Sequence, residues 1–325
     1  MKVVRAGSFL ALVMAVALGC GHPQPGSTRT PTPTPPPKVP SLIDPRWMSF
    51  DKTQPWNWED VDRKITTEYQ EFGFRPMGET EFPHGCNGCG EYPSTARVRV
   101  YAPGKFDPGE FRTGQPVSVN GADGFLRPAP GPDDRLLAWQ YADNAWATAT
   151  GTTTITAKLE PLLELARALR PDDRSPVRLP LSLPTFPAAM PLAAFEIEPA
   201  PYGTIVTFDQ CTTFGPDPAS DPAAPKCAQR SDSLRVQIWR RDGYDSLIDE
   251  TRAVAIKIGG KDGKYDKASH VAAVQVDTEM LVVFELSGPY PAPPTTSLED
   301  VLNGVKWAAE PGNDATWQAV TDWTK

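Results

Sequence analysis

The sequence has few of the residues on which enzyme catalysis usually depends. Only three histidines occur among its 325 residues: His22, His84 and His270. No Gly-x-Ser-x-Gly nucleophile motif is present, and neither a Walker loop nor a Gly-x-Gly-x-x-Gly motif follows a strand-like segment. A histidine-dependent hydrolase would have to use His84 or His270, and His270 has the context of a surface loop. We therefore expect no catalytic residues, no metal ion and no cofactor.

The chain also lacks a positive charge excess and a long apolar run after its first twenty residues. Its net charge is −8, so we expect no nucleic-acid partner, because no basic stripe is present to neutralise phosphates. Proline is abundant instead, with 37 residues, roughly twice the usual ~5 % share. Interior prolines break helices, which excludes a helical bundle, a coiled coil and a polytopic membrane protein.

The N-terminus has the pattern of an export signal. Lys2 and Arg5 precede the uncharged segment 6–18, which is short for a membrane span and typical of a secretory signal. Ala17-Leu18-Gly19-Cys20 resembles the bacterial lipobox, with Ala17 where leucine is usual. The resemblance implies cleavage before Cys20 and attachment of a lipid to its sulfur. An ordinary signal peptide with a chance cysteine is the alternative.

A spacer is expected directly after this signal. Eight prolines lie in 21–40, with Ser, Thr and Gly between them, and such a segment cannot bury enough apolar surface to fold. We therefore predict a signal peptide over 1–19 and a lipidated, proline-rich stalk over 20–45. The predicted location is extracytoplasmic, at the cell envelope, with the lipid anchor in the membrane.

Several segments recur in the same order further along the chain. Residues 97–101 (RVRVY) match residues 235–239 (RVQIW) at an offset of 138. Residues 159–163 match 298–302 at an offset of 139. Such repetition predicts two related units. We place them at 46–175 and 202–325, joined by a proline-rich connector over 176–201.

Each unit has the pattern of strands followed by a helix. Apolar residues alternate with polar ones in the repeated segments, which is the period of a half-buried strand. Segments 136–141 and 145–150 have the pattern of a hairpin, and 158–169 that of an amphipathic helix. The predicted fold class is α+β: two tandem related units, each an antiparallel sheet of about four or five strands with one C-terminal helix packed on it. We also expect the acidic stretch 59–68 to form the solvated face of a helix.

The four cysteines beyond Cys20 suggest two disulfides in an exported chain. The repeat makes Cys86–Cys89 and Cys211–Cys227 the simplest pairing. Glycines and prolines flank the Cys86-Asn-Gly-Cys89 motif, which indicates a loop and not the helix N-terminus of a thioredoxin-type site. Thiol–disulfide exchange and a metal site using His84 remain alternatives.

Aromatic residues supply the ligand candidates. Trp139, Tyr141 and Trp146 lie on the predicted first-unit hairpin, and exposed rings there would form a ligand or partner surface. Core packing is the usual role of large aromatics in such sheets. Trp47, Trp56 and Trp58 form a second group at the start of the first unit, ahead of its repeated strands.

The segments 137–148, 162–166 and 176–180 resemble parts of uncharacterised actinobacterial exported lipoproteins. The resemblance implies an envelope location and supplies no activity. We therefore expect a surface-tethered, non-catalytic binding or scaffold module with an unknown protein, lipid or cell-wall partner. Two alternatives are an envelope thiol–disulfide protein using Cys86 and Cys89, and a lipid- or stress-sensing factor that holds an apolar ligand.

Overall fold

The computed structural model describes the chain between Asp44 and Val320 in eleven stretches. These stretches are 44–53, 56–79, 93–128, 135–183, 192–197, 203–209, 232–240, 248, 251–288, 294 and 297–320. The predicted signal peptide, most of the predicted stalk and all five cysteines lie outside them.

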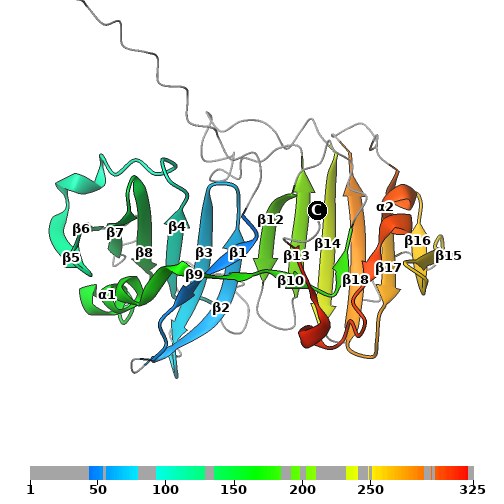
Figure 1. The fold of residues 1–325 in the computed structure, drawn as a ribbon, viewed down its shortest axis with the longest axis horizontal. Helices are drawn as coiled ribbons and strands as arrows, with labels where there is room; N and C mark the ends of the chain where they lie inside the picture. Colours follow the sequence, from blue (N-terminus) through cyan, green and yellow to red (C-terminus); the bar gives the residue numbers. More distant parts are fainter. Residues whose placement is uncertain are drawn as a thin grey trace, which may run out of the picture. The chain divides into compact units, whose positions relative to one another are not determined.

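Fourteen strands form one antiparallel sheet (Figure 1). In spatial order they are β15 (Val254–Ile258), β16 (Lys261–Asp266), β17 (Val271–Gln275), β18 (Met280–Ser287), β14 (Ser233–Arg240), β13 (Thr204–Asp209), β12 (Leu192–Ile197), β2 (Trp58–Ile65), β3 (Tyr69–Pro76), β4 (Ala96–Tyr101), β8 (Ala145–Gly151), β7 (Arg135–Ala142), β6 (Ala122–Pro128) and β5 (Gln115–Val119). The sheet therefore has β15 and β5 as its edge strands, and β12 and β2 lie side by side at its centre.

The strand order is the same when read from either edge. From the centre outward, one half runs β2-β3-β4-β8-β7-β6-β5 and the other β12-β13-β14-β18-β17-β16-β15. The matched sequence segments occupy corresponding places, with 97–101 in β4 and 235–239 in β14. The halves meet where β2 pairs with β12, and there Ile65 lies opposite Phe195.

The predicted fold class is wrong. The protein is mainly β, with one shared sheet of seven strands from each half in place of two separate sheets of four or five. Its described residues include two short α-helices, α1 (Leu159–Ala168) and α2 (Leu298–Gly304), and the chain continues past each one as further strands. Neither helix is therefore the C-terminal element of an α+β unit.

Two strands that sequence reasoning missed explain the error. The acidic stretch predicted as a helix is β2, and its charges pair across strands, as Asp62 does with Arg97 at 3.2 Å. The other missed strand, β12, falls inside the predicted connector 176–201. These two strands join the halves. Residue alternation finds strands but does not say which strands of different units pair.

Short strand pairs and the two helices cover one face of the sheet. β1 (Arg46–Phe50) pairs with β9 (Leu169–Pro176), the segment that follows α1. After α2, β19 (Lys306–Trp307) pairs with β11 (Leu181–Ser182), and β20 (Gln318–Ala319) pairs with β10 (Arg178–Leu179). In each half, a leading segment thus pairs with the chain that follows the helix. The remaining described helical segments are the 3-10 turns η1 (Phe111–Thr113) and η3 (Asp314–Thr316).

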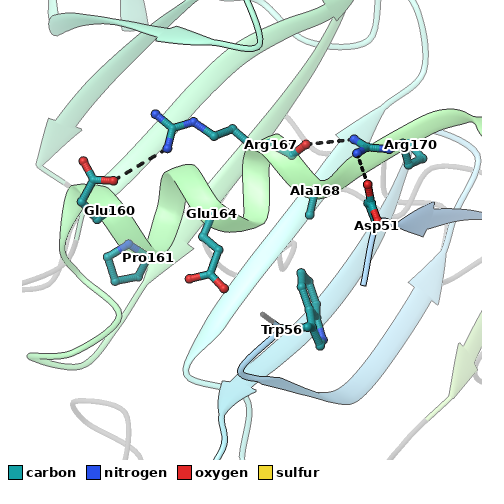
Figure 2. A pocket seen from close by; sticks show the side chains of 8 residues that line it. All are labelled: Asp51, Trp56, Glu160, Pro161, Glu164, Arg167, Ala168 and Arg170. Carbon is teal, nitrogen blue, oxygen red and sulfur yellow. Dashed lines mark hydrogen bonds and ion pairs between the residues drawn. The ribbon is translucent and has the colours of Figure 1, made fainter. Parts of the chain in front are cut away.

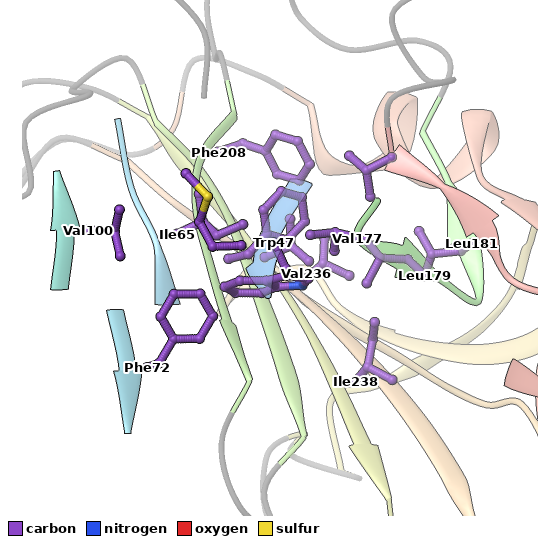
Figure 3. Close-up of a cluster of buried hydrophobic side chains, with 14 of the residues drawn as sticks. Trp47, Ile65, Phe72, Val100, Val177, Leu179, Leu181, Phe208, Val236 and Ile238 are labelled. Atoms are coloured by element: carbon purple, nitrogen blue, oxygen red, sulfur yellow. The ribbon is translucent and has the colours of Figure 1, made fainter. Parts of the chain in front are cut away.

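The core lies between the sheet and this cover (Figure 3). Strand register carries one apolar face across both halves, because opposed residues project to the same side. Residues of this face include Leu137, Ala149, Val98, Phe72, Phe195, Val206, Val236 and Phe284. From the cover, Trp47 packs edge-on against Phe72 at 6.0 Å, and every residue of 177–183 except Arg178 is buried.

Several local predictions are confirmed. The hairpin over 136–150 forms as β7 and β8, and Asn144 in its turn has a positive φ of 52°, which asparagine tolerates. The helix expected over 158–169 is α1. No helix within the described ranges combines the length and hydrophobicity needed to span a membrane.

The joint between the halves can be tested with two isoleucines. Ile65 in β2 is 1 % exposed, whereas Ile155 is 44 % exposed. We expect Ile65→Ala to lower the free energy of unfolding by about 3 kcal/mol, because it leaves a cavity against Phe195. The matched Ile155→Ala should change it by no more than about 0.5 kcal/mol. Urea denaturation measures both, and equal losses would contradict the described joint.

Candidate functional site

The three aromatic residues proposed from the sequence do not form an open surface. Trp139 is 2 % exposed and belongs to the core beneath the cover. Trp146 is 5 % exposed and lies on the opposite face of the sheet, where its ring packs against Phe106 at 6.1 Å. Tyr141 is half-buried, and its hydroxyl donates a hydrogen bond to the Tyr101 carbonyl at 2.8 Å. These side chains therefore serve packing in this structure.

The remaining sites proposed from the sequence fall outside the described residues. They are the lipidation residue Cys20 and the four disulfide candidates Cys86, Cys89, Cys211 and Cys227. Among the residues that the structure does describe, no group of three or more His, Cys, Asp or Glu side chains is placed to hold a metal ion.

A cleft of about 680 Å³ opens beside α1 (Figure 2). One wall is the helix, and the other is the chain that follows β1. We call this cleft the α1 cleft. Its lining residues are Asp51, Trp56, Glu160, Pro161, Glu164, Arg167, Ala168 and Arg170. The volume is in the range of small-molecule sites. Sequence reasoning noted Trp56 only as part of an aromatic group and did not single out the other seven.

The helix supplies a charged stripe to this cleft because its opposite side is buried. Leu162, Leu165 and Ala166 are at most 1 % exposed and fix α1 on the sheet. Glu160, Glu164 and Arg167 follow the i, i+4, i+7 spacing that places residues on one helix face. This spacing can be read from the sequence, and it was the available signal for three of the eight lining residues.

The lining of the cleft includes an ion pair between distant parts of the chain. Arg170 pairs with Asp51, and the Asp51 backbone N–H donates to the Ala168 carbonyl at 2.7 Å. Arg170 also donates to the Arg167 carbonyl at 3.0 Å. Both charged groups therefore have fixed positions where β1 ends and β9 begins.

Asp51 is held in its ionised form. Its carboxylate accepts hydrogen bonds from the Thr53 hydroxyl at 2.5 Å and the Thr53 backbone N–H at 3.0 Å. These bonds, followed by the Arg170 guanidinium, lower the pKa of Asp51 from 3.8 to about 2. Since this value is far below neutral pH, the side chain acts as a permanent anion and does not exchange a proton there.

Two polar atoms in the lining have no hydrogen-bond partner among the described residues. They are the indole nitrogen of Trp56 and the Oε1 oxygen of Glu164, both of which are buried. The Trp56 ring is fixed by Phe50 and Phe74, with centroids at 6.2 and 5.8 Å. Figure 2 shows the Glu164 carboxylate extending from α1 toward the side of the cleft that holds Trp56. A buried acceptor without a donor costs free energy unless a ligand or water supplies one.

The second ion pair of the cleft is much looser than the first. Arg167 and Glu160 approach to 3.7 Å, and their side chains are 49 % and 79 % exposed. Exposed pairs of this kind contribute little to stability, since water screens them. Glu160 can therefore adjust to a ligand more readily than Asp51, whose side chain is 23 % exposed and bonded to both Thr53 and Arg170.

The Asp51–Arg170 pair predicts a pH-dependent contribution to stability. Because the pKa of Asp51 is lower in the folded chain, its contribution is complete above the ordinary pKa of 3.8 and disappears as pH falls toward about 2. We expect Asp51→Asn to destabilise the protein near neutral pH, and the difference from wild type to shrink as pH falls through that window. Urea midpoints across this range measure it.

Asp123→Asn is the control, because it removes one exposed negative charge elsewhere on the sheet. A difference between Asp51→Asn and wild type that stays constant down to pH 2 would contradict the assignment.

Comparison with known proteins identifies no relative. No protein-family model matches the chain, and no curated protein or solved structure is similar to it. The function therefore has to be argued from the chemistry of the site.

Proposed function

We propose that the protein is a non-catalytic binding module, tethered at the cell envelope, that holds a small polar ligand in the α1 cleft. The observation that carries this proposal is the buried Glu164 oxygen, which lacks a hydrogen-bond donor in a cleft walled by an indole ring. A bound ligand that donates a hydrogen bond would satisfy it. The other charged side chains of the lining favour a polar ligand over an apolar one.

The electrostatics of the cleft support binding over acid–base chemistry. A general acid or base works best with a pKa near the operating pH. Asp51 has a pKa of about 2, and its position is fixed by Thr53 and Arg170. Asp51, which is already paired and charged, can orient a ligand but does not transfer a proton near neutral pH.

The N-terminal sequence supports the tether. A lipobox-like Ala17-Leu18-Gly19-Cys20 and the proline-rich segment 21–40 are the features of a lipid anchor followed by an extended spacer. In this proposal the lipid on Cys20 inserts into the membrane and the sheet is presented outside the cytoplasm. In this arrangement the lipid serves only to hold the protein at the membrane, and the α1 cleft binds the ligand.

Binding in the cleft can be followed through the Trp56 indole N–H. We propose an ¹⁵N NMR screen of small polar fragments on the full chain in an uncharged detergent, with the Trp56 signal assigned from Trp56→Phe. At least one fragment should shift this signal saturably and leave the Trp307 signal unchanged. Trp307 is the control because its indole N–H already donates to the Ile258 carbonyl at 2.9 Å. If no fragment shifts the Trp56 signal, the cleft is not a ligand site.

The anchor is tested by Cys20→Ala. The wild-type chain should incorporate an alkyne-labelled fatty acid and sediment with membranes, because an acyl-modified cysteine inserts into lipid. Cys20→Ala should lose the label and leave the membrane fraction. A wild-type chain without label, or a variant that keeps it, would contradict the proposed tether.

A further inference from the structure

We propose that the ligand of the α1 cleft is an organic cation, whose ammonium group lies between the Trp56 ring and the Glu164 carboxylate. This inference rests on the proposed function and names its ligand class. It follows from three properties of the lining: its charge, its aromatic wall and its size.

The charges of the lining leave one carboxylate without a counterion. Asp51 pairs with Arg170, and Glu160 lies 3.7 Å from Arg167. Glu164 has no ion-pair partner within the described chain, and one of its oxygens is buried without a hydrogen bond. The lining thus carries three carboxylates and two guanidiniums, all named above. A ligand with a positive charge balances this surplus, and an anion would increase it.

The aromatic wall favours the same ligand. The face of a tryptophan ring attracts cations through its quadrupole, more strongly than the other aromatic rings do. The structure already shows one ammonium at this ring, since the Lys52 Nζ lies 5.8 Å from the Trp56 centroid. Lys52 is held there by Asp60 at 2.7 Å and does not line the cleft. A ligand ammonium in the cleft would use the same property of the ring and add the Glu164 contact.

The size of the cleft indicates an ammonium group on a larger body. A volume of about 680 Å³ greatly exceeds the ~30 Å³ share of one water molecule, so a small inorganic ion would leave it mostly empty. Pro161 and Ala168 give the lining some apolar surface, which suits the carbon chain of an alkylammonium group. A small free alkylamine has this combination of charge and hydrocarbon.

The test compares probes that differ mainly in charge. Butylammonium, butanol and butyrate have similar carbon chains, and methyl glucoside represents a neutral sugar. Each is titrated at fixed ionic strength into the full chain in an uncharged detergent, and the Trp56 indole signal is followed. We expect butylammonium to shift the signal saturably, and the other three to produce no saturable shift over the same concentrations.

Two variants of the helix separate a specific contact from general attraction. Glu164→Gln and Glu160→Gln each remove one negative charge from α1. We expect Glu164→Gln to weaken butylammonium binding about tenfold, because it removes the charge-assisted contact. Glu160→Gln should weaken it less than about threefold, since that carboxylate is exposed and faces Arg167. The unchanged signals of the other indoles show that each variant is folded.

The possible failures are distinct. If butyrate or methyl glucoside shifts the Trp56 signal and butylammonium does not, the cation assignment is overturned and the binding function stands. If both glutamine variants weaken binding equally, Glu164 is not the specific partner and the assignment is again overturned. If neither these probes nor any fragment shifts the signal, the binding function fails as well.

Discussion

The structure depends on covering the apolar face of its sheet, and in the first half the β1–β9 pair supplies that cover together with α1. A buried glutamine holds the pair in place: Gln70 accepts a hydrogen bond from the Met48 backbone N–H at 2.9 Å and donates one to the Arg46 carbonyl at 2.7 Å. This side chain projects from the sheet into the core. It provides hydrogen-bond partners for the Met48 N–H and the Arg46 carbonyl, two backbone groups of β1. The position of β1 in turn fixes where the chain bearing Asp51 and Trp56 leaves the core.

The α1 cleft is thus a consequence of how the cover is built. One helix face is needed for packing against the sheet, so its charged residues are left beside the end of β1. The Asp51 backbone N–H bonded to the Ala168 carbonyl and the Arg170 ion pair join the two walls at one end. Asp51 is held by Thr53 and Arg170, whereas Glu160 and Arg167 form a looser, exposed pair. The cleft therefore has one well-held anionic group and one pair of charges that can move. This combination is suited to orienting a ligand of mixed polar and apolar character.

Much of the local structure could be predicted from the sequence, and the way its parts join could not. Alternation identified β4 and β14, and helical spacing identified α1, because these patterns arise from one buried face. β2 was mistaken for a helix because its acidic residues pair with neighbours on other strands, as Asp62 does with Arg97. The charged stripe of α1 was readable in advance. The Asp51–Arg170 contact spans 119 residues and leaves no local signal.

The β10–β20 pair limits how early in folding the cover of the second half can form. It joins Arg178 to Ala319, so the last part of the cover closes a loop of more than a hundred residues. Such distant pairings form slowly, since the entropy of loop closure opposes them before any contact is gained. During synthesis, the apolar face of the second half of the sheet therefore stays partly exposed until residues 306–319 have emerged. A chain of this design would need protection from aggregation until β19 and β20 are available to pair.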